Sequence, residues 1–188
     1  MKYFLRKLRI GERRGFTVIE AFVGISILLI GLVGPLMLVN SNLQAGRFSR
    51  DQITSYYLAQ EAIEMVREVR DENFLNGGVD WLSGISSQCY QAASTIRGCR
   101  VDGRPGVVAS ATIMPCSNCP NSAVLRVDTN TGRYGYAGST LSRFYRYIQL
   151  EDIDGGSGVI VRVRVGFDTG RYIQKYTTTD YLRDWDPR

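Results

Sequence analysis

The sequence of 188 residues contains no histidine, and only five prolines and two tryptophans. The absence of histidine excludes a serine–histidine triad. The glycines do not form a P-loop or a dinucleotide-binding fingerprint. These absences leave catalysis without support, so we expect a protein that is not an enzyme and that carries no cofactor.

The chain also lacks an excess of basic residues outside its N-terminus. The first 15 residues contain six of the 23 basic residues and one of the 18 acidic residues, so the remainder carries 17 of each. The formal net charge of +5 therefore belongs to the N-terminal tail. Total charge gives little reason to expect a nucleic-acid partner.

An apolar segment, residues 16–39, follows the basic tail and contains a single charge, Glu20. Its 24 residues would form about 36 Å of helix, enough to cross a membrane. The basic tail predicts that residues 1–15 stay in the cytoplasm and that residues after about 40 lie outside. A secretory signal peptide is the alternative, but no A-x-A-like cleavage site ends the apolar run. An acid in a membrane segment costs roughly 2.5–3.5 kcal/mol, which predicts a function for Glu20.

The helical pattern continues through residues 40–74, where apolar residues recur at steps of three and four. Gly34–Pro35 and Gly46 are the expected kinks, and glycines after Phe74 are typical of a helix end. We predict one long helix from Phe16 to about Phe74. The apolar stripe of its second half comprises Ile53, Tyr56, Ala59, Ile63, Val66 and Val69.

Residues 75–106 are predicted as an irregular connection, and residues 107–188 as an antiparallel sheet. Val159, Val161, Val163 and Val165 alternate with Ile160, Arg162 and Arg164, which is typical of a half-buried strand. Short turns between strands favour a meander, and the helical stripe would cover its apolar face. The predicted fold class is therefore α+β, with a long N-terminal helix packed on the sheet. The predicted strands are 107–114, 123–128, 144–151, 159–167 and 172–182.

Four cysteines, an even number in a segment predicted to be exported, favour disulfides. Three connectivities exist, and proximity in the chain favours Cys89–Cys99 and Cys116–Cys119. A four-cysteine zinc site is the alternative, but the spacings are irregular, and no βαβ pattern supports a redox role for the second pair.

Weaker signals suggest calcium binding at two turns and DNA binding on the predicted sheet. Asp128 and Asn130 open like a calcium-binding loop that lacks its final glutamate, so a hairpin turn is favoured, and Asp152 and Asp154 are similar. Basic residues also interleave with tyrosines, a pattern that a DNA-binding face would share with ordinary solvated sheet positions. These residues are Arg143, Tyr145, Arg146, Tyr147, Arg162, Arg164, Arg171, Tyr172 and Lys175.

The stretch GFTVIE, residues 15–20, after a basic leader and before an apolar run, resembles the N-terminal signal of type IV pilins and type II secretion pseudopilins. The segments YYLAQEAIEMVREVRDENF and SRFYRYIQLED further resemble minor pilins and the pseudopilin I type. The likeness lies mostly in the first 74 residues. No C-terminal disulfide-bonded loop of the major pilins is recognisable.

The resemblance implies that a membrane-bound prepilin peptidase cleaves between Gly15 and Phe16 and methylates the new amine. It also implies that Glu20 pairs with the Phe16 amine of a neighbouring subunit in a filament. The expected partners are the peptidase, other pilin or pseudopilin subunits, the inner-membrane assembly platform and the membrane. The alternative is an uncleaved, membrane-anchored adhesin or ligand-binding module.

Overall fold

The computed structural model describes the backbone of residues 15–77, 80–85, 89–90, 98–103, 113–116, 118–170 and 172–184. The chain divides into two compact units, with the boundary between Gly46 and Arg47. We call described residues 15–46 the anchor and described residues 47–184 the head. The basic leader lies outside the described residues apart from Gly15.

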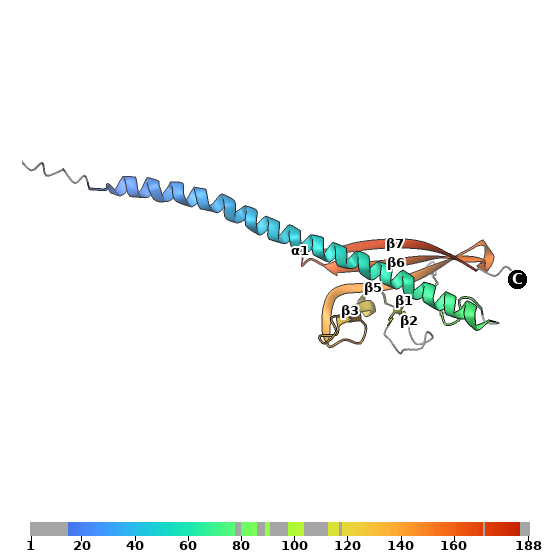
Figure 1. Ribbon diagram of the computed structural model, residues 1–188. Helices are drawn as coiled ribbons and strands as arrows, with labels where there is room; N and C mark the ends of the chain where they lie inside the picture. Colours follow the sequence, from blue (N-terminus) through green and yellow to red (C-terminus); the bar gives the residue numbers. More distant parts are fainter. Residues whose placement is uncertain are drawn as a thin grey trace, which may run out of the picture. The chain divides into compact units, whose positions relative to one another are not determined.

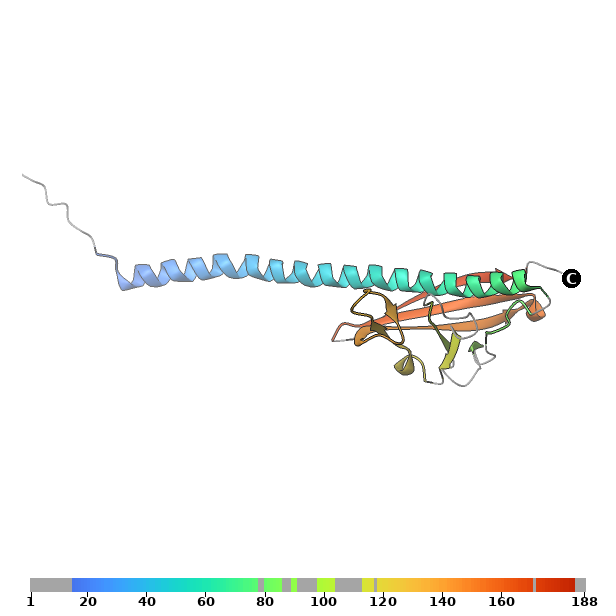
Figure 2. The same cartoon turned by 60° about the horizontal axis from the view of Figure 1, so that its bottom comes forward.

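One helix, α1 (Val18–Asn76), contributes to both units (Figures 1 and 2). Its limits lie within two residues of the prediction, and the helix includes Pro35. Thr17 immediately precedes it, and the Glu20 amide donates to Thr17 Oγ1 at 3.3 Å. A hydroxyl in this position satisfies one of the amides that the first turn leaves unpaired.

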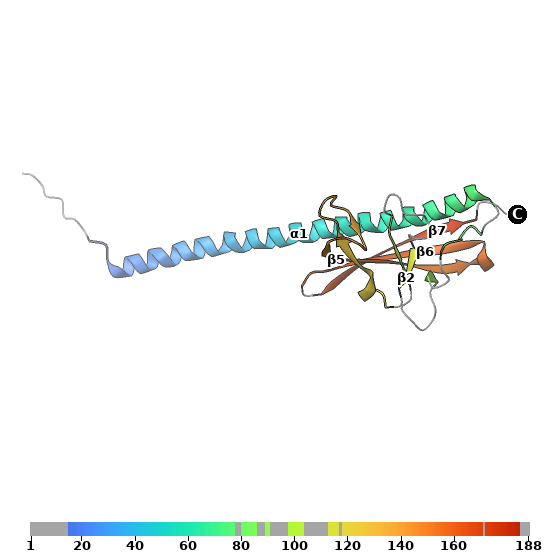
Figure 3. The ribbon, with the colours of Figure 1, turned by 90° about the horizontal axis from the view of Figure 1, so that it is seen from below.

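Seven antiparallel strands form the sheet of the head, on which the head's part of α1 packs (Figures 1 and 3). This arrangement confirms the predicted α+β class. The strands are β1 (Gly98–Val101), β2 (Ile113–Cys116), β3 (Val124–Val127), β4 (Tyr134–Gly135), β5 (Thr140–Ile153), β6 (Gly158–Asp168) and β7 (Ile173–Arg183). Two short 3-10 turns, η2 (Asn121–Ala123) and η3 (Asp154–Gly156), precede β3 and β6.

The predicted meander is correct for its last four strands, because 123–128, 144–151, 159–167 and 172–182 correspond to β3, β5, β6 and β7, which pair in this order. It is wrong for its first strand, because β2 pairs with β1, and it lacks the short strand β4 between β3 and β5. Strand β5 pairs with β6 along one edge, and its other edge pairs with β3 near Thr140–Tyr145 and with β1 at Ile148. Because β5 is 14 residues long, it has room for two short partners on one edge. Residues 75–106 are therefore not wholly irregular, since they contain β1. Of the predicted strand 107–114, only residues 113 and 114 are described, and both belong to β2.

The predicted helical stripe is correct at Ala59, Ile63, Val66 and Val69 and wrong at its beginning. Ile53 is 55% exposed and Tyr56 is 46% exposed. The buried face is rotated away from them, because the sheet contacts a line of residues that begins at Ser55. The other buried residues of this face are Leu58, Ala62, Met65 and Arg70.

Strand β6 has the predicted alternation. Its four valines at 159, 161, 163 and 165 are completely buried beneath α1, and Ile160, Arg162 and Arg164 are half-buried on the opposite face. The middle of strand β5, residues 144–150, is buried on both faces. Its outer face carries Tyr145 and Tyr147, which pack into a second, smaller cluster with Cys116, Cys119 and Ala123.

Candidate functional site

The predicted cleavage position lies in exposed, non-helical backbone directly before α1. Gly15 and Phe16 are both exposed, and Phe16 is 76% exposed. A Cβ added to Gly15 would meet no atom within 4 Å. The fold of the anchor therefore gives no steric reason for glycine at this position.

Glu20 lies in the first turn of α1, with its side chain exposed. A carboxylate there interacts favourably with the positive end of the helix dipole. Glu20 is the one charged residue between Phe16 and Val39 in the sequence. The anchor thus carries a single acidic residue, about one turn from the predicted new N-terminus.

The anchor is apolar around its whole circumference. Every large apolar side chain from Phe16 to Leu43 is at least 47% exposed. A helix that is apolar on all sides normally lies in a protein interior or in a membrane. By length and composition, α1 contains a segment able to cross a membrane. This fits membrane anchoring.

Gly34, Pro35 and Gly46 are all incorporated into α1. Proline lacks the amide that would bond one turn back, so the helix has one fewer hydrogen bond at this point. A Cβ on Gly34 or Gly46 would meet no atom within 4 Å. The kinks expected there stay predictions.

The four cysteines form two disulfides, Cys89–Cys99 and Cys116–Cys119, the pairs that proximity in the chain favours. The first joins the segment before β1 to the strand itself and lies in the core under α1. The second closes the turn after β2 and lies in the small cluster on the outer face of β5. No described cysteine is left free.

The turn at Asp128 is a hairpin turn held by its own side chain. The Asp128 carboxylate accepts from the Asn130 amide at 2.9 Å and from the Thr131 hydroxyl at 3.0 Å. Asp152 is exposed at the end of β5, and the side chain of Asp154 lies outside the described residues. Among the described residues, no three histidine, cysteine, aspartate or glutamate side chains are grouped to hold a metal ion.

The interleaved basic residues are not on one face. Arg146 is completely buried on the core side of β5, which corrects its assignment to a solvated or DNA-binding surface. Arg143 pairs with Asp51 at 2.7 Å, and Arg162 pairs with Glu151 at 3.0 Å. Arg171 lies outside the described residues. DNA binding stays a prediction, and Arg146 is no longer a candidate residue for it.

Arg146 joins three elements of the head. Its guanidinium donates to the Leu58 carbonyl of α1 at 3.1 Å and to the Val101 carbonyl of β1 at 2.8 Å. It also pairs with Glu61, a half-exposed residue of α1. The Tyr136 hydroxyl donates to the Arg146 carbonyl at 2.5 Å. Burial raises the pKa of Tyr136, although the nearby Arg146 charge opposes this shift.

The sequence held a signal for this buried arginine. Phe144, Ile148 and Leu150 occupy the apolar face of β5 at steps of two, and Arg146 stands at the same parity. An arginine at such a position must find partners inside the protein. The charge of Arg146 predicted the solvated face of β5, whereas its parity placed it correctly on the core face.

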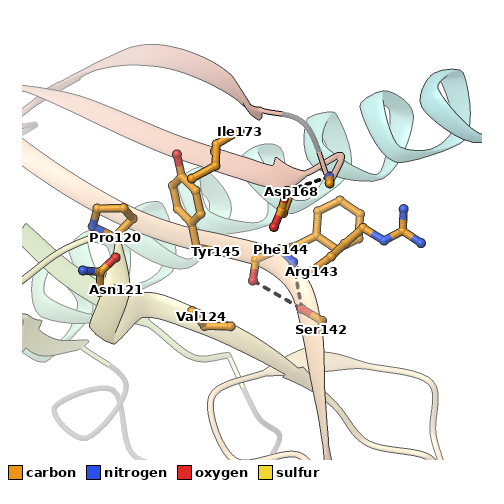
Figure 4. A pocket seen from close by; sticks show the side chains of 10 residues that line it. Pro120, Asn121, Val124, Ser142, Arg143, Phe144, Tyr145, Asp168 and Ile173 are labelled. Carbon is orange, nitrogen blue, oxygen red and sulfur yellow. Dashed lines mark hydrogen bonds between the residues drawn. The ribbon is translucent and has the colours of Figure 1, made fainter.

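A cavity of about 410 Å³ lies at the outer side of the sheet (Figure 4). Tyr145 contributes an aromatic wall, and burial raises the pKa of this tyrosine. Pro120, Val124 and Ile173 add apolar surface, and Asn121, Ser142 and Asp168 add polar groups. Aromatic and apolar walls with a few polar groups are typical of small-molecule sites.

Comparisons with protein-family models, with curated proteins and with solved structures find no match.

Proposed function

We propose that this protein is a structural subunit of the type IV pilin and pseudopilin kind, most similar to the minor subunits. In this proposal it is stored in the inner membrane through residues 16–39, with the head outside the cytoplasm. A prepilin peptidase then removes residues 1–15, and the subunit enters an extracellular filament through its N-terminal helix.

The observation that carries the proposal is the arrangement at the start of the anchor. An exposed Gly15–Phe16 peptide stands before a helix capped by Thr17, and Glu20 lies in its first turn. The helix that follows is apolar on all sides. This combination supports a subunit that exchanges lipid for neighbouring helices, because such a subunit would use each part.

Glu20 then sets the register of assembly. Its carboxylate is costly in hydrocarbon unless a positive partner neutralises it. After cleavage, Phe16 carries a positive amine at the same end of the helix. A subunit leaving the membrane gains most when its Glu20 meets the Phe16 amine of a neighbour, so other axial positions are disfavoured.

The first experiment is N-terminal mass mapping of the membrane-purified protein, with and without a co-expressed prepilin peptidase. We expect a chain beginning at Phe16 and heavier by one methyl group only with the peptidase. Gly15→Val should block cleavage, because the enzyme and not the fold requires glycine. Gly24→Val is the matched control, since a Cβ on Gly24 also meets no atom within 4 Å. An intact N-terminus beside a processed control prepilin would overturn the proposal.

Glu20→Gln tests the assembly step separately. The side chain keeps its size and loses its charge, so processing should continue while incorporation into filaments falls by tenfold or more. Counting subunits in sheared filaments measures this loss. Equal incorporation of Glu20→Gln and the parent would refute the pairing with Phe16.

A second candidate function is a permanently anchored binding module, which the cavity beside Tyr145 favours. It shares the membrane segment with the first proposal but needs no cleavage. The same mass mapping separates the two, since a permanent anchor retains its basic tail in the presence of the peptidase.

A further inference from the structure

Exposed basic and apolar side chains lie together at the end of the head where its part of α1 begins. We call this set the collar. Figures 1 to 3 show the β6–β7 turn at the end of the sheet where the head's part of α1 begins. The collar comprises Arg47 and Arg50 of α1, Arg143 of β5, and Tyr172, Ile173 and Lys175 at the start of β7.

Two contacts hold these elements together. The rings of Phe48 and Phe167 have their centroids 5.9 Å apart, which joins α1 to the end of β6. Arg143 Nη1 lies 2.7 Å from Asp51 Oδ2, which joins α1 to β5. Since Phe167 and Asp168 pair with Gln174 and Ile173, the β6–β7 turn is positioned by the same contacts.

The charge of the collar is unbalanced. Arg47, Arg50 and Lys175 are exposed and take no part in the ion pairs found among the described residues. The two described acids here are engaged. Asp51 pairs with Arg143, and Asp168 accepts from the Gly170 amide at 2.7 Å. Four basic groups thus face two acids in a head whose total charge is otherwise nearly balanced.

We propose that the collar docks on the surface of an anionic phospholipid bilayer, the membrane that the anchor crosses. Arginine and lysine bind anionic headgroups, and tyrosine is enriched at the membrane–water interface. Tyr172 and Ile173 supply apolar surface between the basic side chains. The inference rests on the membrane anchoring in the proposed function and not on cleavage.

The chain connection favours a bilayer over an acidic protein or a nucleic acid. Arg47 is eight residues after Val39 in the sequence, so the chain between the apolar segment and the collar spans at most about 28 Å even when fully extended. A tether of this length makes docking an intramolecular event with a high effective concentration of lipid. Docking would hold the head at the membrane until the subunit is extracted.

The test uses the full, uncleaved chain in vesicles of neutral lipid or of neutral lipid with about 30% anionic lipid, both containing brominated lipid as a quencher. Tyr172→Trp is the reporter, and Tyr181→Trp at the far end of β7 is its control. The two tyrosines have similar exposure, 57% and 64%. Quenching is measured as the difference from the parent, which carries Trp81 and Trp185.

We expect quenching of Tyr172→Trp in anionic vesicles only, and none of Tyr181→Trp. Each basic side chain changes membrane affinity by about fivefold, so Arg47→Gln with Arg50→Gln should lower the equilibrium constant for docking by about 25-fold. Arg183→Gln, an exposed arginine at the far end of β7, should leave it unchanged. Salt at 1 M should act like the double variant.

Equal quenching of the two reporters, or quenching independent of lipid charge, would overturn the proposal that the collar docks on anionic lipid. The chain can insert with its head inside or outside the vesicle. Both leaflets have the same lipid composition, so the orientation does not affect the quenching. Failure of cleavage in the mass mapping would leave a positive docking result standing. A negative docking result in a chain that is cleaved normally would refute membrane docking of the collar and leave the proposed function standing.

Discussion

The two halves of α1 belong to one helix and have opposite surroundings. From Val18 to Gly46, all large apolar side chains are exposed, whereas from Arg47 to Asn76 nine residues are buried against the sheet. The first half has apolar residues on all sides, and the second has one apolar face and one charged face. The difference teaches that the sheet stabilises only the second half. The first half is apolar on all sides and could cross a membrane, which fits membrane anchoring.

A matched pair of substitutions gives the strongest test of this difference. Ala62 is completely buried in the head, and Ala45 of the same helix is exposed. Ala62→Asp places an unpaired carboxylate against the sheet, so we expect the head to lose more than about 4 kcal/mol and to unfold. Ala45→Asp should leave the head's denaturation midpoint unchanged. Similar midpoints for both variants would contradict the division of the helix.

Two arginines of β5 sharpen the comparison within the head. Arg146 is completely buried between α1 and β1, while the Arg143 side chain is 53% exposed in its pair with Asp51. Arg146→Met should cost about 2–4 kcal/mol, because the Val101 carbonyl loses its donor while Glu61 can still reach water. Arg143→Met should cost at most about 1 kcal/mol. Urea unfolding of both variants measures the difference.

The first disulfide stabilises only the head, since residues 15–46 contain no cysteine. Cys89 and Cys99 are separated by 10 positions, and replacing both by serine should cost the head about 2–3 kcal/mol through the entropy of the unfolded chain. The Cys116–Cys119 loop is shorter, with a separation of 3, so its removal should cost less. Thermal unfolding with intact and mutated pairs tests this order, and an equal loss would contradict it.

Local patterns in the sequence were sufficient for α1, for the alternation in β6 and for the pairing of cysteines. Each depends on residues that are close in the sequence, at most 10 positions apart for the cysteine pairs. Two features were not predictable, because they depend on contacts between segments far apart in the sequence. These are the rotation of the buried helical face away from Ile53 and the pairing of β5 with both β1 and β3. Arg146 had a local signal in its parity, but its partners at Leu58 and Val101 come from elsewhere in the chain. The roles of Gly15, Phe16 and Glu20 rest on a local sequence pattern and stay predictions.

The smallest expected effect is a loss of head stability at alkaline pH. Burial is the main cause that raises the pKa of Tyr136 above its ordinary value of about 10. The folded head therefore holds this proton more tightly than the unfolded chain does. Its contribution to stability is complete below pH 10 and is lost as the pH rises through the folded pKa. Tyr90 and Tyr145, also with raised pKa values, act in the same direction.

Tyr136→Phe isolates this effect from the other tyrosines. At neutral pH the variant should lose about 1 kcal/mol, because the hydroxyl no longer donates to the Arg146 carbonyl. Above pH 10 the gap should close, because the unfolded parent releases the Tyr136 proton there while the folded head retains it, whereas the variant has no such proton. Helix signal from the anchor should not change over this range, because residues 15–46 contain no tyrosine. A constant gap between parent and variant up to pH 12 would show that folding does not raise the pKa of Tyr136.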